Sequence, residues 1–222
     1  MSDQAANSPY VFVVDDDKLF LDSLVVLLEA LAFQVRGFSS PSSFLKYYRA
    51  EMPGCLVLDI RMPRQTGLQM YEQLIQEGKR LPVIFITAHA DVSTAVAAMK
   101  SGAIEFLEKP FDRETLLHRV QKALGLDAHV RQQTAQYDAI ADRLKQLSAR
   151  ERETLTLIQA GESNKSMASK LFLTERAVEM RRSTIMRKLQ VHSVAELVEL
   201  ATTHRILTEQ RHSMDQRHTD LA

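Results

Sequence analysis

The sequence has almost none of the chemistry that cross-links proteins outside the cell or anchors them in membranes. Its single cysteine, Cys55, lies in an apolar run and can form no disulfide within the chain, which suits a reducing compartment. The segment from Met1 to Pro9 is polar and lacks an apolar signal segment. No apolar run approaches the ~20 residues that span a bilayer. We therefore expect a cytoplasmic protein with no membrane partner.

Net charge is also absent, because 28 Lys and Arg balance 28 Asp and Glu. At first this argues against a nucleic-acid partner. The charge is unevenly distributed, however: residues 1–126 contain 13 basic and 15 acidic residues, whereas residues 148–205 contain 10 and 7. The net charges of −2 and +3 indicate that a DNA-facing part, if there is one, lies in the C-terminal half.

From Tyr10 to Leu124, short apolar runs alternate with amphipathic stretches. Several runs are unbroken, which is typical of parallel strands buried on both faces. Five successive β–α units predict a doubly wound, flavodoxin-like α/β fold with a five-stranded parallel sheet and helices on both faces. The expected strands are Tyr10–Val14, Phe33–Phe38, Cys55–Leu58, Val83–Ile86 and Ile104–Leu107, and the expected helices are 18–31, 42–51, 66–77, 91–101 and 112–124.

The rest of the chain predicts helices only. A linker helix has an imperfect apolar seam, which fits either a helix lying on a domain surface or a short dimerising coiled coil. Ser148 and Glu151 form a capping box that begins the next helix, and Gly161 ends it. Further helices are expected at about 165–171, from the cap at Thr174 to about 189, and at 194–201. The polar tail is expected to be disordered.

These patterns divide the 222 residues into two compact domains and their connections. The expected parts are a disordered N-terminus over 1–9, an α/β domain over 10–125, a helical linker over 126–147, an all-α domain over 148–205 and a disordered tail over 206–222.

Polar side chains follow four of the five expected strands. In an open α/β sheet, ligands bind at the carboxyl ends of the strands, where strand order reverses. Each of these residues has a plainer interpretation when taken alone, such as a helix N-cap for the aspartate run or a solvent-exposed side chain for the lysine. Their joint occurrence favours a single site made by Asp15, Asp16 and Asp17 after the first strand, Asp59 after the third, Thr87 at the end of the fourth and Lys109 after the fifth.

These side chains together suit phosphoryl transfer. Clustered carboxylates repel one another unless a cation is present, and oxygen ligands without a Cys or His cluster point to Mg²⁺. One carboxylate then remains as a nucleophile for a phosphoryl group. The metal and the Lys109 ammonium can stabilise the transferred oxygens, and the Thr87 hydroxyl can hydrogen-bond the product. The pattern predicts that Asp59 accepts the phosphoryl group.

This segment resembles the receiver domain of two-component response regulators over about residues 10–124. The resemblance rests on Val13-Val14-Asp15-Asp16, Leu58-Asp59-Ile60-Arg61-Met62-Pro63 with Gly67, Ile86-Thr87-Ala88 and Glu108-Lys109-Pro110-Phe111. It implies that a sensor histidine kinase phosphorylates Asp59. It further implies that Asp16, Asp59 and the backbone carbonyl of Arg61 bind Mg²⁺, with Asp15 acting through a water. Lys109 would pair with the phosphate, Thr87 would move toward it, and Phe106 would rotate inward as the aromatic part of the switch. Arg61 and His89 are hypothesised to tune the lifetime of the phosphate.

Residues 148–203 suit a helix-turn-helix, because a short turn joins the second and third helices of this region. The third helix has an apolar face made by Val178, Ile185 and Leu189. Its opposite side supplies polar groups for bases and phosphates, namely Arg176, Arg182, Ser183, Arg187 and Lys188. The plainer alternative is a small helical bundle with a solvated basic face.

Three motifs favour DNA binding, since they resemble the LuxR-type helix-turn-helix: Leu147-Ser148-Ala149-Arg150-Glu151, Gly161-Glu162-Ser163-Asn164-Lys165 and Thr174-Glu175-Arg176-Ala177-Val178-Glu179. A receiver with this module resembles the FixJ/NarL class, nearest the FixJ and StyR type. The resemblance implies that Glu179, Met180 and Ser183 face base edges and that Lys165, Arg176, Arg182 and Lys188 lie near phosphates. It also implies that the fourth helix mediates dimerisation on DNA. The sequence departs from the pattern at Arg181, where many relatives have His.

The expected function is therefore that of a DNA-binding response regulator, with Mg²⁺ as cofactor and a phosphorylation-dependent homodimer as active form. Promoter DNA and RNA polymerase are the further partners, and activation is the expected outcome. The only catalysis expected is that the receiver transfers a phosphoryl group to its own aspartate and later removes it. Two alternatives stay open. One is a haloacid-dehalogenase-like phosphatase with Asp15 as nucleophile, and the other is a receiver whose helical domain no longer binds DNA.

Overall fold

The computed structural model of the chain describes residues 8–88, 96 and 104–219. The chain forms two compact units, of which the first ends at Arg131 and the second begins at Gln132. No helix in the described ranges is long and apolar enough to cross a membrane.

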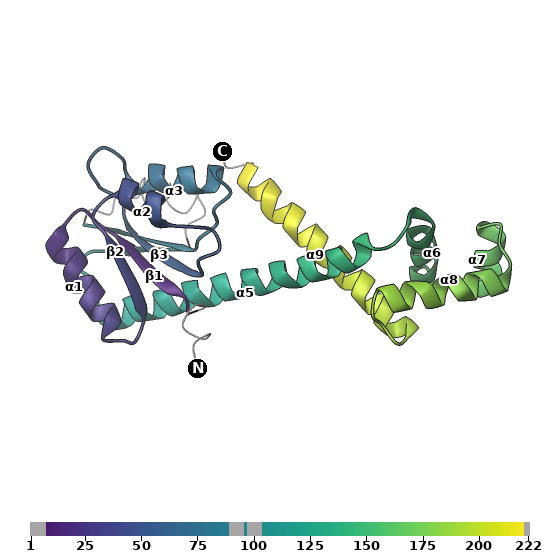
Figure 1. Cartoon of the computed structure of the whole chain (residues 1–222). Coiled ribbons are helices and arrows are strands. Elements are labelled where there is room, and N and C mark those ends of the chain that lie inside the picture. Colours follow the sequence, from purple (N-terminus) through teal and green to yellow (C-terminus); the bar gives the residue numbers. More distant parts are fainter. Residues whose placement is uncertain (1–7, 89–95, 97–103, 220–222) are drawn as a thin grey trace. The chain divides into compact units, whose positions relative to one another are not determined.

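The first unit is built on a five-stranded parallel sheet in the order β2-β1-β3-β4-β5, of which β1, β2 and β3 are labelled in Figure 1. This confirms the expected doubly wound α/β fold, and every strand end lies within one residue of its expected position. The strand order reverses between β1 and β3, so a ligand site is expected where these two strands end. The strands are β1 Tyr10–Val14, β2 Gln34–Phe38, β3 Gly54–Asp59, β4 Val83–Thr87 and β5 Glu105–Glu108.

Among the described residues, two helices pack on each face of the sheet, because alternate residues of a strand point to opposite faces. Phe12 and Val14 of β1 pack with α2 Pro41–Tyr47 and α3 Gly67–Gln76. Val11 and Val13 belong to a second apolar core with α1 Lys18–Glu29 and the first turns of α5 Arg113–Lys145. The inner strands are thus buried on both sides, which explains their unbroken apolar sequence.

Helix α2 is shorter than expected, since it ends at Tyr47 rather than near residue 51. Tyr48 has an extended backbone, and its side chain is buried in the core. The Arg49 guanidinium then donates hydrogen bonds to the carbonyls of Lys46, Tyr47 and Tyr48. A side chain that satisfies the last carbonyls of a helix favours ending it there.

The expected helix 112–124 and the expected linker helix form one continuous helix, α5, of 33 residues. Gly125 lies between the two predicted segments and does not interrupt the helix. A single glycine costs a helix only about 1 kcal/mol. The nearby Asp127 also anchors the helix in the first unit through its hydrogen bonds. The expected helix 91–101 falls outside the described residues apart from Val96.

The second unit is helical and packs around one apolar core that includes Ile140 and Leu144 from the end of α5. It contains α6 Ala149–Gln159, α7 Asn164–Lys170, α8 Glu175–Lys188 and α9 Val194–Thr219. Helix α9 continues to Thr219, so it extends beyond the predicted helix end at about Ala201 and into the segment from 206 that was expected to be disordered. No Gly or Pro interrupts residues 202–219. A contact with α5 supports the extension, because His204 stacks on Tyr137 at 5.0 Å between ring centroids, and Leu207 is buried.

Candidate phosphoryl-acceptor and DNA-contact sites

Two buried carboxylates lie at the point where β1 and β3 end. Asp15 directly follows β1 and is 1% exposed, and Asp59 is the last residue of β3 and is 5% exposed. The loop after Asp59 returns to the end of β3, since the Gly67 amide donates to the Ile60 carbonyl at 2.9 Å. A Cβ atom on Gly67 would lie 2.2 Å from the Asp59 carbonyl oxygen. This close approach explains why glycine stands at that position of the motif.

Lys109 joins the two carboxylates. Its Nζ atom donates to Asp15 Oδ2 at 2.7 Å and to Asp59 Oδ1 at 2.9 Å. The position of Lys109 is set by the sheet, because its amide donates to the Thr87 carbonyl at 2.8 Å where β4 ends. The same ammonium lies 4.0 Å from the centroid of the Phe20 ring on α1, a cation–π contact. Sequence reasoning missed Phe20, because its role depends on how α1 packs.

The remaining oxygens of the two carboxylates accept backbone hydrogen bonds. Asp15 Oδ1 accepts from the Asp17 amide at 2.9 Å, and Asp59 Oδ2 accepts from the Arg61 amide at 2.8 Å. Burial raises the pKa of the Asp59 carboxyl above its ordinary value, although the hydrogen bond from Lys109 opposes the rise. Burial lowers the pKa of Lys109, but its hydrogen bonds to Asp15 and Asp59 outweigh this and leave that pKa raised. One cation thus serves two anions, which leaves the cluster one negative charge in excess.

The three consecutive aspartates have different positions. Asp17 is the N-cap of α1 and accepts from the amides of Leu19 and Phe20. The plainer interpretation of the run, a helix cap, therefore holds for this residue. Asp16 is exposed, whereas Asp15 is buried at Lys109. Within the three aspartates, Asp17 thus caps a helix and Asp15 belongs to the charged cluster at Lys109.

The two expected switch residues lie on the last two strands. Thr87 ends β4 with its side chain fully buried. Phe106 of β5 is half-buried and packs at the edge of the core that lies under α2 and α3. His89 lies outside the described residues.

The residues expected to bind Mg²⁺ fit such an ion in their chemistry and only partly in their arrangement. Asp15 and Asp59 both reach Lys109 Nζ, so they share one small polar space with an excess negative charge. Mg²⁺ characteristically uses one or two carboxylates and keeps several waters. Asp16 is exposed, and the described residues contain no group of three or more His, Cys, Asp or Glu side chains arranged to hold a metal.

A second ion pair, with a buried carboxylate, lies at the opposite end of β3. Asp127 of α5 is 4% exposed, and its Oδ2 atom accepts from the Gly54 amide at 2.9 Å and from Arg131 Nε at 2.7 Å. Arg131 also donates to the carbonyls of Ala50 and Met52. Sequence reasoning missed this pair, because an ion pair between residues four apart on a helix is usually exposed.

In the second unit, α7 and α8 are joined by the turn that the sequence predicted. Thr174 caps α8 and accepts from the Ala177 amide at 3.2 Å. Val178 and Ile185 of α8 are fully buried in the core of the unit, as is Leu189 just beyond the helix. The apolar face expected from the spacing of these three residues is therefore confirmed.

The residues expected to contact DNA fall into two groups. The first group is exposed, and it consists of Lys165 on α7 and of Arg176, Glu179, Met180, Ser183 and Arg187 on α8. The spacings of four, three and four between positions 176, 180, 183 and 187 place these residues on one stripe of the helix. Met180 is 67% exposed, so its apolar side chain lies open to contact on this stripe.

The second group has partners within the unit. Arg181 donates to the Thr154 hydroxyl at 3.3 Å, and Arg182 donates to the Asn164 side chain. Lys188 Nζ lies 2.8 Å from Glu151 Oε2, the carboxylate of the capping box that begins α6. The hydrogen bond from Lys188 is the main cause that lowers the pKa of Glu151 to about 2.

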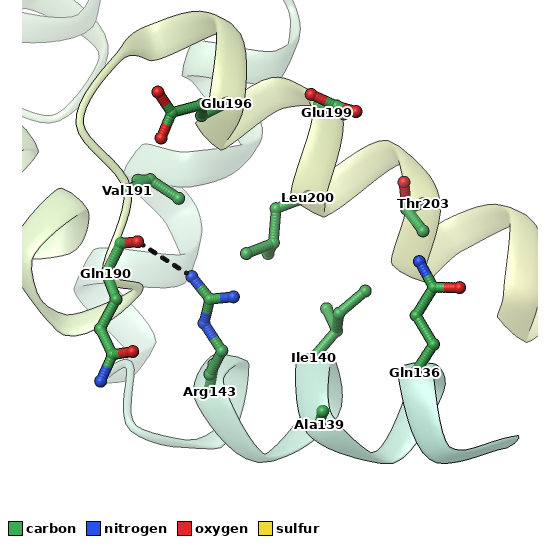
Figure 2. Close-up of a pocket in the computed structure, with 10 residues that line it drawn as sticks. All are labelled: Gln136, Ala139, Ile140, Arg143, Gln190, Val191, Glu196, Glu199, Leu200 and Thr203. Carbon is green, nitrogen blue, oxygen red and sulfur yellow. Dashed lines mark hydrogen bonds between the residues drawn. The ribbon is translucent and has the colours of Figure 1, made fainter. Parts of the chain in front are cut away.

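The end of α5 and the beginning of α9 enclose an open pocket of about 430 Å³ (Figure 2). Ile140 on α5 and Leu200 on α9 point toward each other from the two helices, and the Arg143 guanidinium donates to the Gln190 carbonyl at 3.3 Å. None of the residues that line the pocket is among the expected DNA contacts. The pocket therefore shares no lining residue with the α8 stripe.

Comparisons with known proteins match the two parts of the chain to two separate families. Residues 11–121 match the family described as the response regulator receiver domain, and residues 145–201 match the bacterial regulatory proteins of the luxR family. The chain is 37% identical over 198 residues to the response regulator protein TodT of Pseudomonas putida, which covers 89% of this chain and 86% of TodT. It is 36% identical to the transcriptional regulatory protein FixJ of Bradyrhizobium diazoefficiens, over 86% of this chain and 94% of FixJ.

The chain belongs to the FixJ/NarL-type response regulators. Among solved structures, that of the response regulator StyR matches this response regulator with a TM-score of 0.82 and 42% identity, over 88% of this chain and 98% of StyR. The buried cluster at Asp59 thus lies in a receiver domain, and the α8 stripe lies in a LuxR-type helix-turn-helix. The protein is a DNA-binding response regulator.

Proposed function

We propose that a sensor histidine kinase transfers a phosphoryl group to Asp59 and that this modification promotes promoter binding by the helix-turn-helix. The observation that carries the proposal is the double contact of Lys109 with Asp15 and Asp59. It brings a buried nucleophile, a second acidic group and a cation to one point at the end of the sheet. This is the set of groups that phosphoryl transfer to a carboxylate needs.

The transfer forms a bond between a carboxylate oxygen of Asp59 and phosphorus, and the bond from phosphorus to the donor breaks. Asp15, Asp16, Asp59 and the backbone carbonyl of Arg61 would hold Mg²⁺, which supplies positive charge to the phosphoryl oxygens. Lys109 already contacts Asp59 Oδ1, so its ammonium is placed to pair with the new phosphate. Loss of its contact with Asp59 would then be compensated by a stronger charge-assisted hydrogen bond.

The phosphorylated state acts through a population shift, since the phosphate favours a receiver conformation in which it makes additional contacts. Thr87 supplies a hydroxyl to the phosphate in that state, and Phe106 turns inward beside it. The fully buried Thr87 and the half-buried Phe106 support these roles. Water later removes the phosphate, and Arg61 tunes the rate of that step.

The exposed stripe of α8 is proposed to enter the major groove. Glu179, Met180 and Ser183 face base edges, while Lys165, Arg176 and Arg187 contact phosphates. Arg181, Arg182 and Lys188 support this surface from within the domain, because their side chains contact Thr154, Asn164 and Glu151. Phosphate contacts strengthen binding to any DNA sequence, whereas base contacts provide specificity.

The regulator is proposed to consist of a receiver over 10–125, a helical linker over 126–147 and a DNA-binding domain over 148–205. It works in the cytoplasm as a phosphorylation-dependent homodimer that activates transcription with RNA polymerase. The match of residues 11–121 to the receiver family and of residues 145–201 to the luxR family supports this organisation.

Acetyl phosphate labelling followed by peptide mass spectrometry tests the acceptor. We expect the label on Asp59 in the wild type and its loss in Asp59→Asn. Asp22→Asn is the matched control, because Asp22 is exposed on α1. Label on Asp15 would instead support the phosphatase alternative and would contradict the proposal.

Salt titration of DNA binding tests the α8 surface. Arg187→Ala should weaken binding and reduce the slope of log affinity against log salt by about one unit, because one phosphate contact is lost. Arg205→Ala, an exposed arginine on α9, should leave the slope unchanged. An unchanged slope for Arg187→Ala would remove this residue from the surface, and absence of any DNA binding would favour the receiver that no longer binds DNA.

A further inference from the structure

Asn164, the first residue of α7, contacts two residues on successive turns of α8. Its Oδ1 atom accepts a hydrogen bond from the Arg182 guanidinium. Its Nδ2 atom donates to Glu179 Oε1 at 3.4 Å. One half-buried amide thus connects the helix before the turn with the helix after it.

An asparagine is well suited to this position because its side chain offers a donor and an acceptor together without a charge. The carbonyl end faces a cation, and the amino end faces a carboxylate. Aspartate would keep the acceptor for Arg182 but would place a second negative charge beside Glu179. Alanine would remove both contacts and leave the Glu179 side chain free to change rotamer.

Glu179 lies on the exposed stripe of α8. A carboxylate on such a helix can accept a hydrogen bond from the exocyclic amine of cytosine in the major groove. Because Asn164 holds Oε1, the second oxygen, Oε2, remains available for a base. A side chain already held in one conformation loses less entropy when it binds.

We propose that Asn164 is a positioning residue for base recognition, which fixes the Glu179 carboxylate toward one cytosine and so contributes to specificity from outside the recognition helix. The inference rests on the proposed DNA-binding function and adds a determinant to it. In this proposal Arg182 acts together with Asn164 and Glu179, because its cation orients the Asn164 amide.

The test uses the full-length protein with beryllofluoride, a mimic of the phosphoryl group, to select duplexes from a randomised pool. Affinities are then compared for duplexes changed at single base pairs. Wild type should prefer cytosine at one position in each half-site. Glu179→Ala and Asn164→Ala should each reduce that preference by about fivefold or more, and the double variant should lose no more than Glu179→Ala alone. Such non-additivity indicates that the two residues act through one contact.

Two further variants separate positioning from folding. Asn164→Asp keeps the acceptor for Arg182, so it should keep the melting temperature near that of the wild type and still lose the cytosine preference. Ser169→Ala, at an exposed position on the same helix, should change neither property. Salt slopes should be equal in all the variants, because no phosphate contact is removed.

Each outcome decides between the inference and the function on which it rests. If Glu179→Ala loses the preference while both Asn164 variants retain it, Asn164 does not position Glu179. If Glu179→Ala also retains the preference, the carboxylate reads no base and the inference fails while DNA binding stands. If wild type selects no sequence at all, the proposed function itself fails.

Discussion

The two ends of strand β3 each have a buried charged cluster, and the clusters differ in how their charges are balanced. At the amino end, one carboxylate, Asp127, pairs with one guanidinium, Arg131. At the carboxyl end, Asp15 and Asp59 share the single ammonium of Lys109. The first cluster is neutral, whereas the second keeps one negative charge in excess.

This difference separates a structural ion pair from a reactive one. The Asp127 carboxylate accepts from a backbone amide as well as from Arg131, and Arg131 also hydrogen-bonds two carbonyls. All of these groups serve to fix α5 against the loop before β3. At the other end, burial raises the pKa of Asp59, and an additional positive charge would be favourable there. Unbalanced charge at the end of a strand is thus the better indicator of chemistry.

The largest effect is expected from breaking the neutral pair. Asp127→Ala leaves the Gly54 amide without its acceptor and Arg131 without its counterion, so it should lower the free energy of unfolding by about 3–5 kcal/mol. Urea denaturation of the full-length protein measures this free energy. The unfolding transition of the first unit is followed separately from that of the second. Asp142→Ala is the control, because its pair with Lys145 is more than 70% exposed on both sides, and it should cost less than about 0.5 kcal/mol. If the two variants lost the same free energy of unfolding, the Asp127 pair would contribute no more to stability than an exposed pair.

A smaller effect is expected from removing the cation at the reactive end. Lys109→Met leaves two buried carboxylates facing each other, which should lower the free energy of unfolding by about 2 kcal/mol at neutral pH. The loss should shrink in acid, where one carboxylate takes up a proton. Denaturation at several pH values gives the profile. A loss that does not depend on pH would indicate that Lys109 contributes through packing alone.

The smallest expected effect, that of replacing Asp59, is a gain in the free energy of unfolding rather than a loss. Because the folded-state pKa of Asp59 is raised above its ordinary 3.8, its stabilising contribution is present below that value and is lost as pH rises through the folded-state pKa. At neutral pH the ionised Asp59 therefore costs stability. Asp59→Asn should raise the free energy of unfolding by about 1 kcal/mol at neutral pH, and the gain should vanish in acid. A variant less stable than the wild type at neutral pH would contradict this account of the cluster.

The reactive end was predictable from the sequence to a large extent, and the neutral end was not. Asp15, Asp59, Thr87 and Lys109 all follow recognisable buried strands, and parallel strands bring their carboxyl ends to one edge. Asp127 and Arg131 lie in a polar helical stretch, where an ion pair at this spacing is usually exposed and contributes little. Their burial depends on the loop before β3, which no local pattern specifies.

The helical half shows the same limit. The apolar spacing of α8 predicted which side is buried, and the capping residues predicted where the helices begin. The length of α9 was not predictable, because a polar composition suggests disorder while the contact of His204 with Tyr137 is tertiary. Likewise, basic residues of α8 look alike in sequence, and only the fold shows that Lys188 faces Glu151 while Arg187 is exposed.

The central claim is that charge added at Asp59 controls the affinity of the helix-turn-helix for DNA. It is tested most directly by anisotropy titration of a selected duplex with wild type and Asp59→Asn, each with and without beryllofluoride. We expect beryllofluoride to tighten binding by wild type by about 5- to 150-fold and to leave the variant unchanged. Equal affinities of wild type with and without beryllofluoride, or a variant that responds as wild type does, would contradict the claim.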